Sequence, residues 1–304
     1  MKWVYTSQRK EYANALVELG KTRTDVVVLD ADLSSSTRTV EFAKKFPERF
    51  FNCGIAEQNM MGTAAGLAAS GKVVFASTFA VFATGRCWDQ IRQSIAYPNL
   101  DVKIVATHAG ITVGGDGASH QALEDIGLMR SLPNLTVIVP ADGIEAYKAV
   151  KAVVDHCGPC YVRLGRADVP MLTSMDSEFI IGKATILREG SDVTLVGCGQ
   201  MVAACMDAAE ELHKRGVKAE VINMSTVKPL DEEVLLRSVE KTGAVVTAEE
   251  HSIATGLGSA VASVLGENLP TPMKMIGTPD CFGESGESEE LMRRYGLTAE
   301  RIAL

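Results

Sequence analysis

The sequence predicts an α/β protein made of two doubly wound domains with mostly parallel sheets. Short apolar runs, typical of strands buried on both faces, alternate with stretches whose apolar residues recur at helical spacing. This alternation is typical of βαβ units. It is interrupted over residues 167–182, which show no clear periodicity. At 304 residues the chain is long enough for two cores, so we expect domains over residues 1–166 and 183–304, joined by a linker over residues 167–182.

The expected elements follow from these patterns in chain order. In the first domain the strand signals lie at residues 25–30, 72–77, 102–107, 136–139 and 161–164, and helical patterns lie at 37–46, 57–71, 78–97 and 143–155. In the second domain the expected strands are 193–197, 218–223, 244–248 and 273–276, with helices near 202–215, 231–241, 256–265 and 288–295. One strand of the second domain ends in Glu249, Glu250 and His251. Without supporting chemistry nearby, a structural or interface role is favoured for these three.

Composition narrows the class of protein. The chain is 46% hydrophobic and 22% charged, as in a soluble globular enzyme. Its net charge of −8 disfavours nucleic acid or an anionic membrane as a partner. The first 16 residues carry charges where a signal peptide would need an apolar run. We therefore expect a cytoplasmic protein without a membrane partner.

Seven cysteines, an odd number without framework spacing, indicate reduced thiols. Cys157 and Cys160 form a C-x-x-C, but a helical pattern precedes it and an apolar strand follows it. A redox motif has the reverse order, with the first cysteine opening a helix. We expect a simple turn there, and no second C-x-x-C completes a zinc site.

Glu57 is the residue around which a site is expected. It opens a helix made almost wholly of small apolar residues, which offer a carboxylate no hydrogen bonds. Taken alone, it could be an ordinary N-terminal acid stabilised by the helix macrodipole. The loop of residues 30–36, which contains Asp32 and Ser36, follows a buried strand, where α/β sheets hold ligands. Its hydroxyls could equally cap the following helix.

The stretch after the Glu57 helix favours a site. Phe79 and Phe82, three residues apart, share one helix face, as a pocket wall or as core. His108 ends the third strand, and a glycine-rich loop with Asp116 and His120 follows. Two histidines and an aspartate so close together suggest proton handling or hydroxyl recognition, although glycine-rich loops also close hairpins.

Five ordered motifs resemble the transketolase family: GIAEQNM at 54–60, STFAVF at 77–82, THAG at 107–110, GDGASHQ at 115–121 and RLGR at 163–166. The resemblance covers essentially the whole chain. It implies a thiamine-diphosphate pyrimidine-binding domain followed by a transketolase C-terminal domain.

The resemblance also implies residue roles. Glu57 would hydrogen-bond N1′ of the thiamine diphosphate aminopyrimidine, and Phe79 and Phe82 would line the pyrimidine pocket. Asp32 and Ile55 would lie near the cofactor, Asp32 across a dimer interface. Contacts to sugar hydroxyls or phosphate would come from the remaining matched residues, which are His108, Asp116, His120, Arg166 and Ser36. Glu57, His108 and His120 are the expected catalytic residues.

The diphosphate-binding half of the family's site is missing. In that family a Gly-Asp-Gly triplet and a later asparagine, on a separate domain, hold Mg²⁺ and the diphosphate. This chain has Gly115-Asp116-Gly117, but Asn134 comes too early and the triplet falls inside the substrate motif. The resemblance therefore implies no metal site here, and an N-terminal partner subunit that holds Mg²⁺ and shares the cofactor in a dimer of heterodimers.

The implied activity is transfer of a two-carbon ketol unit between sugar phosphates by the C-terminal subunit of a split transketolase. THAGI and WDQ at 88–90 also lean towards deoxyxylulose-phosphate synthase and the β chain of 2-oxoacid dehydrogenases. His108 and the short GDGASHQ loop favour ketol transfer. A non-catalytic regulatory chain of the same fold is the third alternative, and the ketose donor and aldose acceptor stay open.

Overall fold

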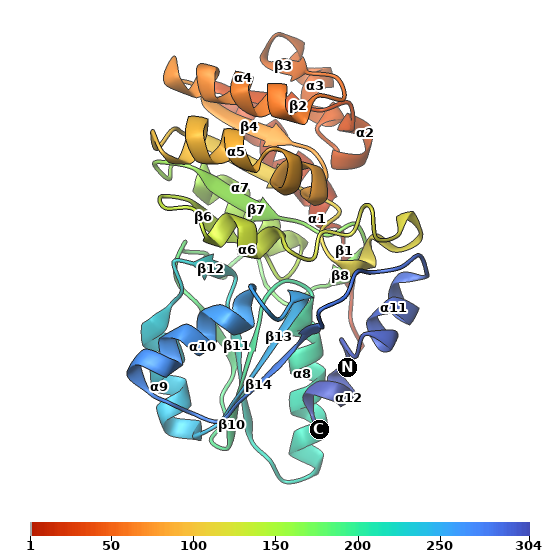
Figure 1. Ribbon diagram of the computed structural model, residues 1–304, viewed down its shortest axis with the longest axis vertical. Helices are drawn as coiled ribbons and strands as arrows, with labels where there is room; N and C mark the ends of the chain where they lie inside the picture. Colours follow the sequence, from red (N-terminus) through yellow and green to blue (C-terminus); the bar gives the residue numbers. More distant parts are fainter. Residues whose placement is uncertain (1) are drawn as a thin grey trace.

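Two α/β units lie one above the other in the molecule (Figure 1). The structure is a computed structural model and describes residues 2–304. The predicted fold class is confirmed, because both units contain mostly parallel sheets covered by helices. The boundary at residues 167–182 stays a prediction.

The first sheet has seven strands in the order β12-β6-β7-β5-β4-β2-β3. Its six parallel strands are β2 (Val26–Asp30), β3 (Phe50–Asn52), β4 (Val73–Ser77), β5 (Val102–Ala106), β6 (Thr136–Ile138) and β7 (Cys160–Arg163). Every residue of β2, β4 and β5 is buried, because helices cover both faces.

Helices α1 (Gln8–Thr22), α3 (Val40–Lys45) and α7 (Gly143–Val153) pack on one face of this sheet. The other face carries α4 (Glu57–Ala69), α6 (Asp125–Arg130) and the segment between them. That segment consists of α5 (Trp88–Gln90) between two π-helical stretches, η2 (Phe82–Arg86) and η3 (Ile91–Ala96), where one regular helix was predicted. Such π-helical stretches are frequent at functional sites.

The helix predicted at 37–46 is broken into α2 (Ser34–Thr37) and α3. Arg38 between them has a left-handed backbone, with φ of 70°. The buried Asp30 carboxylate explains the break, since it accepts hydrogen bonds from the Leu33 amide and the Thr37 and Thr39 hydroxyls. These side-chain bonds compete with a continuous helix.

The second sheet has the order β14-β13-β10-β11-β9. The bounds are β9 (Thr185–Arg188), β10 (Val193–Gly197), β11 (Ala219–Asn223), β13 (Val245–Ser252) and β14 (Met273–Thr278). Its helices are α8 (Met201–Lys214), α9 (Glu232–Thr242), α10 (Leu257–Asn268), α11 (Ser288–Arg294) and α12 (Ala299–Ile302). The smaller elements are β1 (Tyr5–Thr6), which pairs with β8 (Val169–Pro170), and the 3-10 turns η1 (Pro47–Arg49) and η4 (Ile111–Asp116).

The two units share structure as well as a boundary. Strand β12 (Thr226–Lys228) follows β11 of the second sheet but pairs antiparallel with β6 at the edge of the first. One hydrophobic cluster contains buried side chains of both units, among them Val139, Val196 and Met224. The second unit therefore completes the first sheet.

The C-x-x-C segment forms the turn that the sequence predicts. It follows α7 and ends at Cys160, the first residue of β7, and all seven cysteines are free thiols. Burial raises the pKa of the Cys160 thiol to about 12, so this thiol stays protonated and unreactive near neutral pH.

Candidate active site

The predicted site residues lie at the carboxyl ends of the central strands of the first sheet. His108 follows β5, Phe79 follows β4, and Asp32 and Ser36 follow β2. Glu57 is the first residue of α4. This edge is where open α/β sheets bind ligands.

Four aromatic rings form a continuous wall there. Phe79 stacks on His108, with ring centroids 3.7 Å apart and planes 22° apart. Phe82 lies nearly parallel to Phe79, with centroids 5.9 Å apart and planes 13° apart. The His120 ring meets Phe82 edge-on at 5.4 Å. The structure thus brings together four of the predicted residues.

His108 is held neutral in a strained position. Its φ is 58°, in the left-handed region that most residues with side chains avoid. Its Nδ1 lies 2.8 Å from the Thr107 hydroxyl. Burial, with the nearby charges of Arg9 and Arg166, lowers the pKa of His108 to about 3. At neutral pH its imidazole therefore exchanges hydrogen bonds without carrying charge.

Glu57 is 3% exposed, and its carboxylate accepts from a residue that the sequence analysis did not single out. The Arg86 guanidinium lies 3.3 Å from Glu57 and 4.5 Å from the centroid of the Phe82 ring. Arg86 is half-exposed and comes four residues after Phe82, on the same helix face. That spacing is the sequence signal from which a contact between Arg86 and Phe82 could have been predicted. A planar group that bears N–H donors therefore lies on Phe82 and against Glu57.

A cluster of positive charge borders the aromatic wall. Arg166 makes an ion pair of 3.5 Å with Asp116, and both side chains are about two-fifths exposed (42% and 41%). Arg9, which no sequence motif indicated, donates to the carbonyls of Ser36 (3.0 Å) and Arg166 (2.9 Å). Burial and the charges of Arg38 and Arg166 lower the pKa of Arg9, as expected where cations crowd together. Such a cluster is suited to bind an anion such as a phosphate group.

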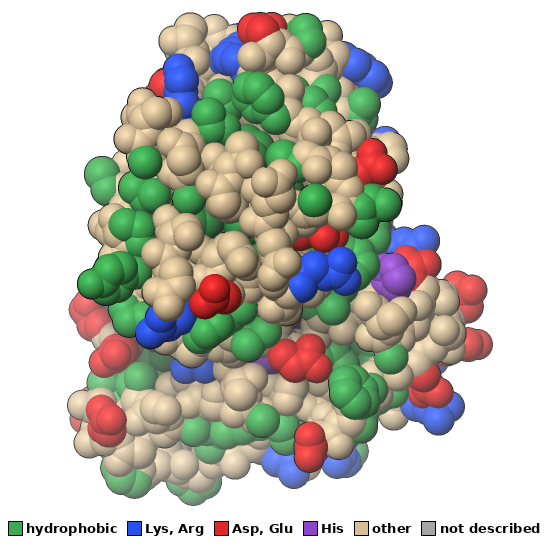
Figure 2. All heavy atoms as spheres, turned by 45° about the horizontal axis from the view of Figure 1, so that its top comes forward, with side chains coloured by type: hydrophobic (Ala, Val, Ile, Leu, Met, Phe, Trp, Pro, Cys, Tyr) green, Lys and Arg blue, Asp and Glu red, His purple; other side chains and the backbone are tan. Residues whose placement is uncertain are grey.

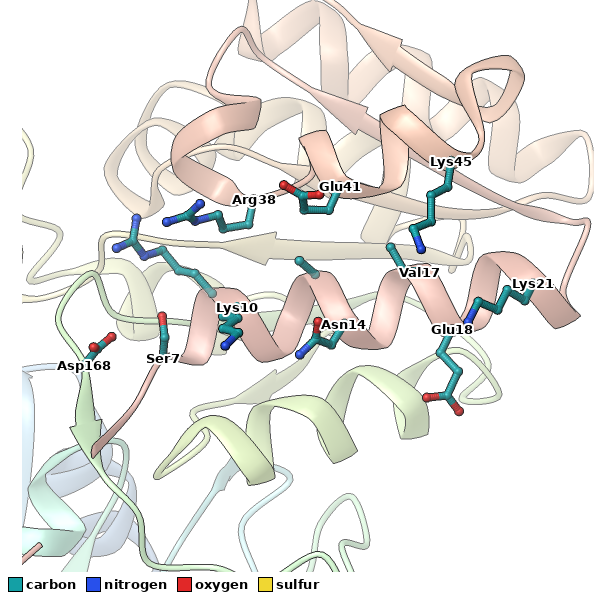
Figure 3. Close-up of a pocket in the computed structure, with 12 residues that line it drawn as sticks. Ser7, Lys10, Asn14, Val17, Glu18, Lys21, Arg38, Glu41, Lys45 and Asp168 are labelled. Atoms are coloured by element: carbon teal, nitrogen blue, oxygen red, sulfur yellow. The ribbon is translucent and has the colours of Figure 1, made fainter. Parts of the chain in front are cut away.

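A groove of about 810 Å³ leads away from this cluster between α1 and α3. In Figure 3, Arg38 and Asp168 lie at one end of the groove, and Lys21 and Lys45 lie towards the other. Within residues 2–304, the groove's Lys10, Lys21 and Lys45 make no ion pair of 4.0 Å or less. Unpaired cations on a chain of net charge −8 attract anions to this flank.

Asp32 and Ile55 lie in the loops that follow β2 and β3. Asp32 exchanges two hydrogen bonds with Asn52, at 3.1 and 3.0 Å, and Ile55 is 79% exposed. In the part of the chain that the structure describes, neither makes a hydrogen bond or ion pair with another predicted site residue. In the same part, no three His, Cys, Asp or Glu side chains are placed to hold a metal ion.

The chain belongs to the transketolase family. Residues 5–171 match the family model described as the transketolase pyrimidine-binding domain, and residues 182–302 match the transketolase C-terminal domain. Within residues 2–304 no helix is long and apolar enough to cross a membrane.

Among its relatives are subunits of transketolases. It is 46% identical to a subunit of the 6-deoxy-6-sulfo-D-fructose transketolase of Clostridium sp. strain MSTE9, over 97% of this chain and 91% of that one. It is 40% identical to a subunit of the apulose-4-phosphate transketolase of Phocaeicola vulgatus, over 97% and 94%. A solved structure described as a split gene transketolase, inactive beta4 tetramer, has a TM-score of 0.92 at 54% identity, covering 98% of this chain and 96% of that one.

Proposed function

We propose that this chain is the C-terminal subunit of a two-chain, thiamine-diphosphate-dependent transketolase that transfers a two-carbon ketol unit between sugar phosphates. The observation that carries the proposal is the placement of Glu57. This buried carboxylate, an aromatic wall, two histidines and an arginine cluster line one edge of the first sheet. The names of the related transketolase subunits support the same interpretation.

The residues fit the aminopyrimidine part of the cofactor. The position of Arg86 supports this fit, because its flat, N–H-bearing group stacks on Phe82 and donates to Glu57. When bound, thiamine diphosphate supplies the electron sink that cleavage of a ketose carbon–carbon bond requires. Glu57 would share a proton with N1′, and Phe79 and Phe82 would pack against the ring.

The other residues would handle the substrate. Neutral His108 and the more exposed His120 would exchange hydrogen bonds and protons with sugar hydroxyls. Asp116 would accept from a hydroxyl. Arg166, with Arg9 and Ser36 beside it, would bind the sugar phosphate by charge-assisted hydrogen bonds.

The partner subunit would supply what this chain lacks. Asp116 of the Gly-Asp-Gly triplet is paired with Arg166 at the substrate side, so we assign the diphosphate and Mg²⁺ to an N-terminal subunit. The face with α4 shows few charged side chains (Figure 2). Phe51 on β3 and Ile55, just before α4 in the chain, are 42% and 79% exposed. Such a face suits association, and we propose a cytoplasmic dimer of heterodimers in which Asp32 and Ile55 reach the cofactor of a neighbouring chain.

Reconstitution tests this proposal. The chain is mixed with candidate N-terminal subunits, and thiamine-diphosphate-dependent ketol transfer is measured on a panel of ketose and aldose phosphates. We expect activity only in the mixture, and Glu57→Gln should lower kcat by about 10²–10⁴-fold without loss of assembly.

Three results would contradict the proposal. Turnover by the isolated chain would exclude dependence on a partner. Decarboxylation of a 2-oxoacid with no ketol transfer would favour the dehydrogenase alternative. Full activity of Glu57→Gln would remove the role assigned to this carboxylate.

A further inference from the structure

The second unit holds the loop that carries two of the proposed substrate-binding residues. Residues 109–120 include η4, Asp116 and His120. In Figure 1 this yellow segment lies beside the dark blue chain that leads into α11. The loop has no strand of its own, so its shape depends on the contacts it makes with that unit.

Glu250, on β13 of the second sheet, makes the central contact. It is 6% exposed, and its carboxylate accepts from the Thr112 amide at 2.7 Å and the Thr112 hydroxyl at 2.8 Å. Gln200, just before α8, donates to the other carboxylate oxygen and also reaches the Thr112 hydroxyl at 3.2 Å. The position of the loop therefore depends on a buried side chain 138 residues away along the chain.

The backbone of the loop is shaped to accept this contact. Gly110 has φ of 82°, and a Cβ there would overlap the Glu250 carboxyl group. Only glycine combines that backbone angle with such a close approach. The requirement for glycine at position 110 follows from the carboxylate beneath it.

Three further side chains, those of Ser288, Gln121 and Arg166, hold the loop. Ser288 donates to the Thr112 carbonyl at 2.9 Å, and the Gln121 side chain donates to the carbonyls of Ile111 (3.1 Å) and Glu284 (2.9 Å). On the substrate side, Arg166 donates to the Val113 carbonyl at 2.6 Å. The loop is thus clamped between the second unit and the phosphate-binding arginine.

We propose that Glu250 is a positioning residue of the second domain. It fixes the position of residues 109–120 through Thr112, and thereby the placement of Asp116 and His120 against the sugar. The proposal rests on the proposed function for its substrate. It gives the C-terminal domain a part in substrate recognition, through Thr112.

Glu249 provides a matched control from the same strand. It is also buried, but its carboxylate accepts from the Leu257 amide (2.6 Å) and the Gly258 amide (2.8 Å) at the start of α10. It caps a helix and has no hydrogen bond to the loop. We therefore expect substitution of Glu250 to affect the loop, and substitution of Glu249 to affect the start of α10.

The test combines kinetics of the reconstituted two-chain complex with hydrogen exchange of the full chain. Glu250→Ala should raise KM for the sugar phosphate about tenfold or more, with a smaller change in kcat, because the loop loses the two hydrogen bonds that Thr112 donates to this buried carboxyl group. It should also speed exchange in residues 109–121. Glu249→Gln should leave KM within about twofold and speed exchange in residues 257–265 instead.

Two variants keep the test decisive. Glu250→Gln retains one carbonyl oxygen for Thr112 and should fall between wild type and Glu250→Ala. If Glu250→Ala does not fold, Thr112→Val serves in its place. This variant keeps the hydrogen bond from the backbone amide of residue 112 to Glu250, loses the one from the hydroxyl, and should also raise KM.

Unchanged KM and unchanged exchange of residues 109–121 in Glu250→Ala would overturn the proposal. It would also be overturned if Glu249→Gln raised KM and sped exchange of residues 109–121 as much as Glu250→Ala does. If the wild-type complex transfers no ketol unit, the proposed function fails, while the exchange measurements still decide whether Glu250 holds the loop.

Discussion

His108 and His251 both lie near the carboxyl end of a parallel strand, one in each unit, and their surroundings differ. His108 comes two residues after β5, His251 is the last residue but one of β13, and both side chains are buried. Burial lowers the pKa of both, to about 3 for His108 and about 4 for His251. Both imidazoles are therefore neutral near pH 7.

The two imidazoles differ in the hydrogen bonds that their ring nitrogens make. His251 pairs through Nδ1 with the Ser252 carbonyl (2.9 Å), and its Nε2 accepts from the Ile126 amide (3.1 Å). His108 uses Nδ1 with Thr107, and within residues 2–304 its Nε2 has no hydrogen-bond partner. At the carboxyl edge of the second sheet, His251 binds the first unit through the Ile126 amide, whereas the His108 edge of the first sheet is where we propose that the ligand binds.

The largest expected effect concerns the contact between the units. Asp125 accepts from Arg163 at 2.7 Å and from Tyr161 at 2.6 Å, and its carboxylate lies 3.7 Å from His251. Asp125→Ala should lower the free energy of unfolding by about 3–5 kcal/mol, because Arg163 would be left buried without its carboxylate. Chemical denaturation measures this, and a loss below about 1 kcal/mol would contradict the stabilising role assigned to this buried pair.

The second effect is a pH dependence from His251. Its folded pKa, about 4, lies below its ordinary value of 6.5, so the unfolded chain binds more protons between these values. Stability should therefore fall by up to about 3 kcal/mol as pH drops from 6.5 to 4. The difference in unfolding free energy between wild type and His251→Gln should shrink over this window. A difference that does not change with pH would contradict the assignment.

His108 should show the opposite profile, with a large effect on catalysis and a small effect on stability. His108→Asn is expected to lower kcat/KM of the reconstituted complex about 100-fold, close to 2.7 kcal/mol in activation free energy. Its midpoint of unfolding should stay near that of wild type. A stability loss as large as that of Asp125→Ala would place His108 among the structural residues.

The smallest effect is expected at Arg86. Its half-exposed pair with Glu57 contributes little energy, but it covers the face of Phe82 where the pyrimidine would lie. Arg86→Ala should therefore tighten cofactor binding by up to about fivefold, as measured by cofactor titration of the two-chain complex. Weaker binding would instead make Arg86 a cofactor contact.

Sequence patterns predicted the long elements and part of the site for physical reasons. The buried runs at 25–30, 72–77 and 102–107 are β2, β4 and β5, because fully covered strands are apolar throughout. The short β12 left no such signal, since its three residues belong to one sheet by sequence and to the other by pairing.

The site shows the same division. Glu57, Phe79, Phe82, His108 and His120 could be expected to lie together because they follow neighbouring strand ends. Arg9 could not, because the carbonyls to which it donates lie 27 and 157 residues away in the chain. For Arg86, the spacing of four residues from Phe82 was the only local signal. Which hydrogen bonds Glu250 makes depends on how two units pack, and no local pattern encodes that.

The crossing of β12 also bears on how the chain could be divided. A fragment ending within residues 167–182 would leave β6 with unpaired backbone donors and acceptors. Such an edge can pair with another chain and cause aggregation. A cut between the two units would therefore leave the sheet of the first unit without its edge strand.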